Sequence, residues 1–366
     1  MTFLHRPCLS VTLTGLLVLG AVVASHGEGF ALTASEIAKL SGPDRQKILE
    51  DGARKEGKVV FYSSMTVNQL LAPMGQAFER RYPFVKFEYW RGDTAPILQK
   101  MTAERRANLV QHDVLEYSGN AVMTAIKADA VESFASPVLA PYGKDFYDAA
   151  NGLWAGTRIS YFGLAYNPKL VAANEVPKTY EDLLNPKWRD KLVWAISETG
   201  NVQFVAHMMV WQGDRAGEEY LKKLSAQRIV PFTASSRAMV DRVGQGEYSI
   251  ALHAFANHPV ISKAQGASLD VSMLEPIDSE VAGIQMAKGA PHPHAAMLLI
   301  DYVMSQEGQT VMREADYFPT HPQVDPKDNM RGVVPRLLKM KETVFKPETM
   351  FERRDQAMSM IEKYFK

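Results

Sequence analysis

The sequence has one cysteine, no excess of either charge and no apolar run long enough to cross a bilayer. A single cysteine among 366 residues cannot build a disulfide framework. Lysine plus arginine and aspartate plus glutamate each number 41, so the basic excess of a nucleic-acid-binding protein is missing and no nucleic-acid partner is expected. Because no stretch approaches about eighteen consecutive apolar residues, no spanning helix is predicted.

The local motifs of several enzyme classes are also missing. The chain has no Gly-x-Ser-x-Gly elbow, no His-Glu-x-x-His pair and no phosphate loop ending in Gly-Lys-Ser/Thr. We therefore expect a protein that is not an enzyme. The members of a Ser-His-Asp triad come together only in the fold. An exported hydrolase thus stays open as an alternative of a different class.

The first 31 residues predict an export signal. Arg6 precedes an apolar run, Val11–Val23, of about thirteen residues, which is typical of a secretory signal and too short to span a bilayer. Small residues follow, so cleavage is expected after Ala24 or after Ala31, with a short N-terminal anchor as the alternative. Cys8 precedes the apolar run, so the mature chain would have no thiol. We expect a periplasmic protein.

The rest of the chain is predicted to form an α/β protein of two domains. Its length suggests two domains at about 100–200 residues each, and 46% hydrophobic with 22% charged residues is typical of folded chains. In the first half, β-rich runs alternate with helical periodicity and end in polar or glycine residues, which predicts a mostly parallel sheet. The predicted strands are Lys58–Tyr62, Val85–Trp90, Asp113–Tyr117, Tyr161–Asn167, Lys191–Ile196, Tyr248–Leu252 and Val281–Met286.

A set of short motifs occurs in order along the chain. The motifs are Tyr62-Ser63-Ser64, Tyr166-Asn167-Pro168-Lys169, Leu183 to Lys191, Gly244-Gln245-Gly246-Glu247, Gly289 to Ala296, Asp301-Tyr302, Ser305 and Glu307-Gly308-Gln309. Together they resemble the motifs of bacterial extracellular solute-binding proteins that serve ABC importers. The resemblance is to the branch that includes ferric-iron, thiamine and phosphonate binders, and it runs from about Lys58 to Thr320.

This resemblance implies an α/β, two-lobed type II periplasmic-binding-protein fold, with two α/β lobes joined by a two-strand hinge. It also implies a small-molecule solute in the cleft between the lobes, ABC permease transmembrane subunits as partners, no cofactor and a monomer. Lobe closure would follow by hinge bending. The expected divisions are a signal peptide at 1–31, lobe 1 at 32–161 plus 281–312, lobe 2 at 162–280, and a C-terminal helical segment at 313–366 packing on the outside.

The iron ligands that the resemblance would imply are not in place. Ferric binders of this branch use a histidine, a glutamate and a tyrosine pair, where this sequence has Thr66, Ser118 and Ala256-Asn257. Ferric iron is a hard cation that needs anionic oxygen donors. The sequence therefore predicts no metal site. Iron bound as a chelate, or through His253 or His258, remains the alternative within the family.

Polar groups at strand ends and helix starts form the predicted ligand site. Helix N-termini suit a phosphonate or carboxylate, and Arg91 could add a bidentate contact. Ordinary helix capping is the alternative interpretation for each residue. The predicted ligand-binding residues are Ser63, Ser64, Arg91, Asp93, Thr94, Tyr117, Ser118, Tyr161, Thr199, Gly200, Asn201, His253 and Asn257. They predict a small anionic or zwitterionic solute.

Overall fold

The computed structural model describes residues 32–365; the expected signal and its cleavage points lie outside the described residues. The strands are β1 (Lys58–Ser63), β2 (Lys86–Arg91), β3 (Val114–Tyr117), β4 (Val131–Glu132), β5 (Ala155–Tyr166), β6 (Leu192–Ala195), β7 (Val230–Phe232), β8 (Ile250–Phe255), β9 (Asp270–Ser272), β10 (Ile277–Ala287), β11 (Phe318–Pro319) and β12 (Glu342–Phe345).

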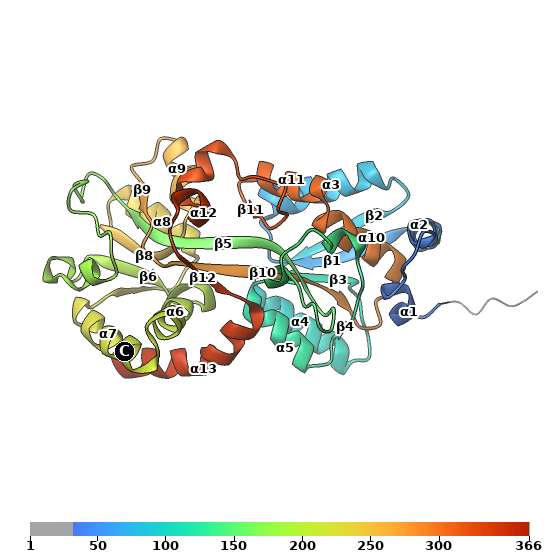
Figure 1. Cartoon of the computed structure of the whole chain (residues 1–366), viewed down its shortest axis with the longest axis horizontal. Coiled ribbons are helices and arrows are strands. Elements are labelled where there is room, and N and C mark those ends of the chain that lie inside the picture. Colours follow the sequence, from blue (N-terminus) through green and yellow to red (C-terminus); the bar gives the residue numbers. More distant parts are fainter. Residues whose placement is uncertain (1–31, 366) are drawn as a thin grey trace, which may run out of the picture. The chain divides into compact units, whose positions relative to one another are not determined.

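Helices precede, separate and follow these strands (Figure 1). They are α1 (Ala34–Ala38), α2 (Arg45–Glu56), α3 (Ala72–Arg81), α4 (Thr94–Arg106), α5 (Gly119–Lys127), α6 (Gln203–Gln212), α7 (Asp214–Leu224), α8 (Ser236–Gln245), α9 (Asn257–Ala264), α10 (Pro293–Met304), α11 (Gln306–Glu314), α12 (Pro335–Leu338) and α13 (Pro347–Tyr364). Within residues 32–365, no helix is both long and apolar enough to cross a membrane.

The first group of strands has the order β2-β1-β3-β10-β5. β1 is parallel to β2 and β3, as the strand-turn-helix pattern predicts, whereas β10 is antiparallel to β3 and β5. α3 and α11 lie on one side of these strands and α4 and α5 on the other (Figure 1). Because the parallel strands end at one edge, the starts of α4 and α5 are brought together there.

β5 and β10 are the strands that connect this group to a second one. β5 pairs with β10 as far as Tyr161 and with β8 from Phe162 onward. Beyond β8, the strands β6 and β7 continue the sheet in parallel register. The predicted strand at Tyr161 begins earlier in the structure, at Ala155. β5 is longer than predicted because it takes part in both groups.

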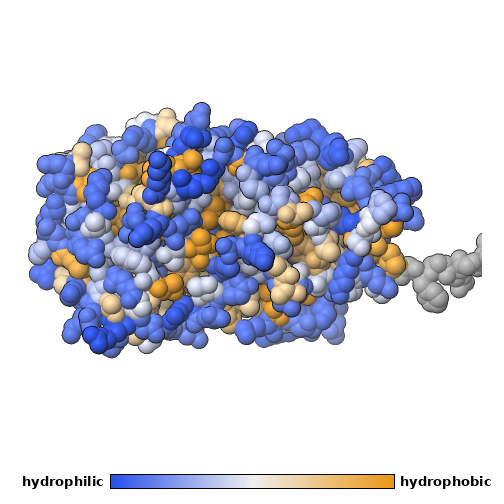
Figure 2. All heavy atoms as spheres, viewed as in Figure 1, coloured by the Kyte–Doolittle hydropathy of each residue, from blue (hydrophilic) through white to orange (hydrophobic). Residues whose placement is uncertain are grey.

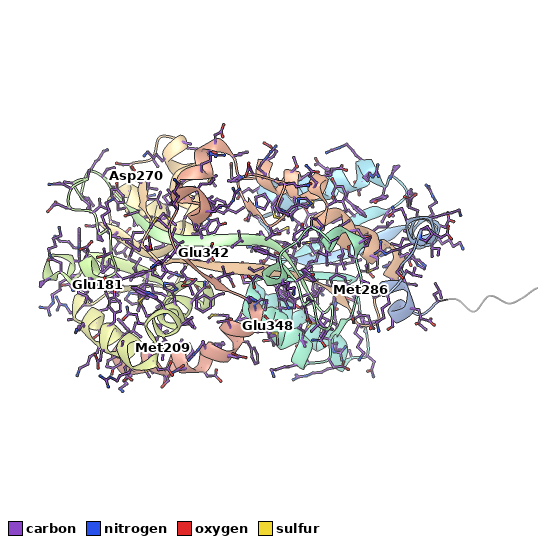
Figure 3. The ribbon with its side chains drawn as sticks, in the orientation of Figure 1. Glu181, Met209, Asp270, Met286, Glu342 and Glu348 are labelled. Carbon is purple, nitrogen blue, oxygen red and sulfur yellow. The ribbon has the colours of Figure 1, made fainter. Side chains whose placement is uncertain are left out.

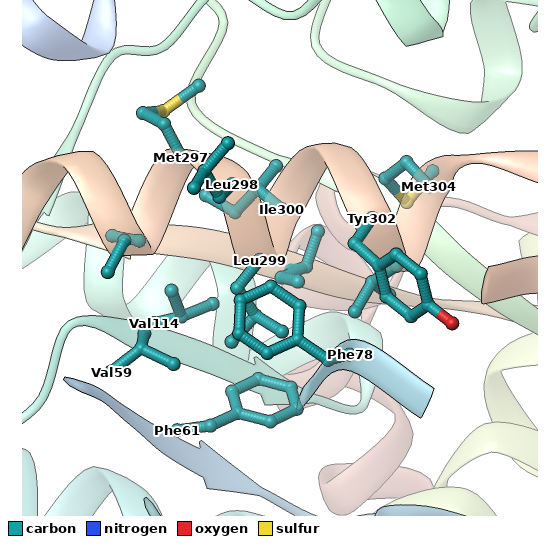
Figure 4. Close-up of a cluster of buried hydrophobic side chains, with 14 of the residues drawn as sticks. Val59, Phe61, Phe78, Val114, Met297, Leu298, Leu299, Ile300, Tyr302 and Met304 are labelled. Atoms are coloured by element: carbon teal, nitrogen blue, oxygen red, sulfur yellow. The ribbon is translucent and has the colours of Figure 1, made fainter. Parts of the chain in front are cut away.

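The apolar helix α10 lies at the centre of the first core. Its residues 295–304 are all buried, and Leu298 and Leu299 belong to one cluster with Phe61 and Phe78 (Figure 4). A helix that is apolar on every side is stable only when it is enclosed. Burial of each large side chain contributes about 1.5–3 kcal/mol, so this cluster fixes the framework on which the strand ends are displayed.

The C-terminal segment 313–366 differs from the helical appendage expected from the sequence. It adds β11 to the edge of β5 and β12, in parallel register, to β10. α13 then packs against both α5 and α6 (Figure 1), and Phe345, Met350 and Ala357 are buried. These short strands lack a long apolar alternation, so the sequence pattern gives no clear signal for them.

A buried ion pair between α2 and α10 provides a stability test. The Arg45 guanidinium pairs with Asp301, which also accepts a 2.6 Å hydrogen bond from Ser136 Oγ. Arg45→Met leaves the carboxylate buried without its cation, so we expect a loss of about 3–5 kcal/mol in the free energy of unfolding. The exposed pair Lys47–Asp51 is the control, and Lys47→Met should cost much less stability, because water screens an exposed pair. Urea unfolding measures both, and equal losses would contradict this assignment.

Candidate ligand-binding cleft

A cavity of about 510 Å³ lies where the two groups of strands meet. Eight of its lining residues are serine or threonine, which gives the walls many short hydrogen-bonding groups. The lining residues are Ser64, Asp93, Thr94, Ala95, Ser118, Asn120, Arg158, Ile159, Ser160, Ser197, Thr199, Ser235, Ser236, Phe255, Asn257, His258, Glu280, Ala282, Tyr317 and Phe318. This cavity is called the cleft below.

Four helices begin at the cleft. Thr94 starts α4, Ser118 precedes α5, Ser235 is the N-cap of α8, and Asn257 starts α9. The first N–H groups of a helix have no intrahelical acceptor, and the helix dipole places positive charge at this end. Convergence of several such ends makes the cleft suitable for an anionic group.

Arg158 is the cleft's cationic side chain, and Glu116 holds it in place. Glu116 is fully buried at the end of β3, where its carboxylate pairs with the Arg158 guanidinium. The same carboxylate accepts a 2.7 Å hydrogen bond from Ser63 Oγ. Arg158 Nη2 in turn donates to Ser64 Oγ at 3.2 Å. The ion pair therefore fixes the guanidinium at the cleft wall, although burial lowers the pKa of Arg158.

The cleft also contains acidic groups. Glu280 is buried at the wall, and its Oε1 accepts a 2.9 Å hydrogen bond from the Gly119 N–H at the start of α5. Asp93 lies at the opening with a side chain 76% exposed, and it pairs with Arg91 at 2.7 Å. The cleft thus offers one buried carboxylate and one exposed carboxylate alongside the helix N-termini and Arg158.

Six of the thirteen residues predicted from the sequence line the cleft. They are Ser64, Asp93, Thr94, Ser118, Thr199 and Asn257. Each follows a strand or precedes a helix, which is the position that the general rule for α/β sheets assigns to ligand groups. The structure thus brings together predicted residues that are far apart in the chain.

Buried hydrogen bonds turn four of the predicted residues away from the cleft. Ser63 donates to Glu116, Tyr117 donates to Gln285, and the Asn201 side chain accepts a 3.2 Å hydrogen bond from the Ser197 N–H. His253 Nε2 lies 2.6 Å from an oxygen of Asp278. Because these groups use their polar atoms inside the protein, we do not carry them forward as ligand contacts.

Three more predicted residues also lie outside the cleft lining. Arg91 pairs with Asp93 at the rim. Gly200 is packed so closely that an added Cβ would lie 2.2 Å from the Ala195 carbonyl oxygen, which makes its role one of backbone packing. Tyr161 lines a different cavity, since side chains along a strand point alternately to opposite faces. These three residues therefore lie outside the cleft lining, and their contact with a ligand stays a prediction.

The sequence reasoning missed Arg158, Ser160 and Glu280, which lie on the connecting strands. The apolar signal of β5 begins at Tyr161, so the segment before it gave no reason to expect a strand. If the strand is extended toward the N-terminus from Tyr161, the alternation of side chains between its two faces places Arg158 and Ser160 on the same face. Glu280 lies just before the predicted strand Val281–Met286, so the apolar pattern does not include it in the strand.

His258, which lines the cleft at the start of α9, makes the folding stability depend on pH. Burial lowers its pKa to about 3, and Arg237 adds to the shift, so the imidazole is neutral in the folded protein. As the pH decreases from 6.5 to 5, the unfolded chain binds a proton at His258 that the folded chain does not. The free energy of unfolding should therefore decrease by up to about 2 kcal/mol over this range. His258→Gln should remove this part of the pH dependence. Urea unfolding of both proteins at pH 7 and pH 5 measures the difference, and identical slopes would contradict a depressed pKa.

Solved structures share this fold over most of the chain. The periplasmic binding protein AfuA of Actinobacillus pleuropneumoniae, with exogenous fructose-6-phosphate bound, matches with a TM-score of 0.71 and 22% identity, covering 85% of this chain and 99% of that one. Iron-bound HitA of Pseudomonas aeruginosa matches with a TM-score of 0.71 and 20% identity, over 84% and 99% of the two chains. These matches confirm the predicted type II periplasmic-binding-protein fold.

Sequence comparison gives the family. A Salmonella typhimurium periplasmic protein, provisionally assigned 2-aminoethylphosphonate binding, is 24% identical over 214 residues, which are 53% of this chain and 60% of the relative. A profile described as bacterial extracellular solute-binding protein matches residues 112–335, more than half of the chain. The predicted non-enzymatic transport role is confirmed by this match. The chain therefore belongs to the bacterial extracellular solute-binding protein family.

Proposed function

We propose that this protein captures a small zwitterion in the cleft and delivers it to the transmembrane subunits of an ABC importer. The observation that carries the proposal is the mixed charge of the cleft. Arg158 and four helix N-termini face it, together with the carboxylates of Glu280 and Asp93. An anionic oxygen group would contact the first set, and an ammonium group would contact the second.

A zwitterion fits these charges better than a simple anion does. Glu116 already neutralises Arg158, and Glu280 already occupies the Gly119 N–H of α5. A purely anionic ligand would therefore lie close to the buried Glu280 carboxylate, and this repulsion is unfavourable where water is excluded. An ammonium group beside Glu280 removes this conflict. The provisional 2-aminoethylphosphonate assignment of the Salmonella relative is consistent with such a ligand.

We further propose that ligand binding closes two lobes, with the boundaries expected from the sequence, about β5 and β10. The cleft lining supports this because it combines residues up to Asn120 with residues from Ser197 onward. A ligand shifts an open–closed equilibrium only if its contacts differ between the two states. Contacts from both sides of the cleft satisfy that condition. The proposed working form is a periplasmic monomer after cleavage of the signal peptide at Ala24 or Ala31.

Iron is the less favoured ligand. Among residues 32–365, no group of three or more histidine, cysteine, aspartate or glutamate side chains is arranged to hold a metal ion. Thr66 is engaged with the Tyr317 hydroxyl at 3.2 Å, and Asn257 donates to the Asp316 carbonyl oxygen at 3.2 Å. The positions that the resemblance would assign to iron ligands thus offer neutral groups, and neutral oxygens are weak donors for ferric iron.

Paired ligands test the zwitterion proposal. We expect 2-aminoethylphosphonate to bind at least about tenfold more tightly than ethylphosphonate, or β-alanine to do so relative to propanoate, because the ammonium adds a charge-assisted hydrogen bond of about 1.5–3 kcal/mol. Glu280→Gln should remove most of this preference. Titration calorimetry measures it, and an amine-free ligand that binds as well as its amine partner would refute the zwitterion proposal.

Two arginines test where the anionic end lies. Arg158→Lys keeps the charge but loses the planar guanidinium geometry, so affinity for the same zwitterion should fall about tenfold or more. Arg91→Ala is the control because Arg91 pairs with Asp93 at the rim and does not line the cleft. The affinity of the Arg91→Ala variant for the zwitterion should change less than about threefold, because water screens a charge at the surface. The opposite order of effects would place the anion at Arg91.

A further inference from the structure

A second cavity, of about 350 Å³, lies on the other side of β5 from the cleft. Ile159 and Phe318 are paired across β5 and β11 and line both cavities. Figure 2 shows apolar side chains gathered near the middle of the face in view, where β5 and β10 lie in Figure 1. The Ile159–Phe318 pair thus separates two binding-sized spaces.

The walls of the second cavity are mainly apolar. Phe146, Phe318, Val324 and Val334 line it, and the rings of Phe318 and Tyr161 meet edge to face with centroids 4.8 Å apart. Ligand sites typically combine such walls with a few polar groups that orient the ligand. The second cavity is therefore suited to the apolar body of a small molecule.

Glu342 and Tyr161 are two of the polar groups that line this cavity, together with Thr320, His321 and Arg336. Glu342, labelled in Figure 3 beside β10, is accessible, and its Oε1 accepts a 2.6 Å hydrogen bond from Ser279 Oγ. Its surroundings desolvate the carboxyl and raise the pKa of Glu342. Within residues 32–365, no cation forms an ion pair with Glu342, and no hydrogen bond engages the Tyr161 hydroxyl.

The nearest arginine does not neutralise this carboxylate. Arg336 also lines the cavity, but it pairs with Asp325 instead, and its side chain is 57% exposed. A carboxylate that is accessible within apolar walls favours a ligand that brings its own positive charge. The phenol oxygen of Tyr161 adds an acceptor for a second N–H of the same group.

We propose that this cavity is a second ligand site, for a small apolar molecule that carries one protonated amino group. The ammonium binds Glu342 and the Tyr161 oxygen, and the apolar body contacts Phe146, Phe318 and the two valines. The proposal does not depend on the ligand of the cleft, because its polar groups belong to this cavity alone.

Titration with 2-phenylethylamine tests the site, monitored by calorimetry or by ligand-observed NMR. We expect saturable binding of 2-phenylethylamine to the full-length mature protein. The neutral 2-phenylethanol should bind about tenfold more weakly because it lacks the ammonium that Glu342 attracts. The anionic 3-phenylpropanoate should not bind because its charge is of the same sign as that of Glu342. Glu342→Gln should weaken binding of the amine at least about tenfold, and Tyr161→Phe should weaken it less.

Glu280→Gln is the matched control, because it makes the same substitution at the buried glutamate of the cleft. In this variant, binding of 2-phenylethylamine should stay within about twofold of that to the unmodified protein, because the two cavities share no polar side chain. Thermal unfolding of all variants checks their folding. Loss of amine binding in Glu280→Gln but not in Glu342→Gln, or no saturable binding to the unmodified protein, would overturn the proposal.

Discussion

The antiparallel pairing of β5 with β10 is the constraint on which both cavities depend. Its register places Ser160 opposite Glu280 and Arg158 opposite Ala282, and all four line the cleft. Side chains alternate along a strand, so Ile159 and Tyr161 extend to the second cavity. The period of a strand is two residues. A shift of one residue in this register would therefore place Ile159 and Tyr161 on the side of the cleft, and Arg158 and Ser160 on the side of the second cavity. The charges of the cleft thus follow from a backbone register.

A second constraint is the ion pair between Glu116 and Arg158. It links the end of β3 to β5 and orients the guanidinium toward Ser64. Burying a charged pair costs desolvation energy that only good geometry and further hydrogen bonds offset. Ser63 supplies one of those bonds to Glu116. A residue predicted as a ligand contact therefore serves instead to hold the group that faces the cleft.

Much of the fold could be predicted from the sequence, because it is encoded locally. The apolar runs that became β1, β2 and β3 are short and continuous, and polar residues mark their ends, so periodicity and helix capping identify them. The site was harder to predict. Ser63 and Ser64 are indistinguishable in sequence, and both hydroxyls donate to Glu116, yet only Ser64 also lines the cleft. Arg158 and Glu280 meet only through long-range strand pairing, which local patterns do not reveal.

The most direct test of the account is the identity of the solute that the protein holds after export. Native mass spectrometry of protein purified from the periplasm without refolding, followed by denaturation and small-molecule analysis, gives the mass and charge groups of the bound compound. The mixed charges of the cleft predict a small molecule with one amine and one phosphonate or carboxylate. Bound ferric iron, or a ligand with no basic group, would contradict the account.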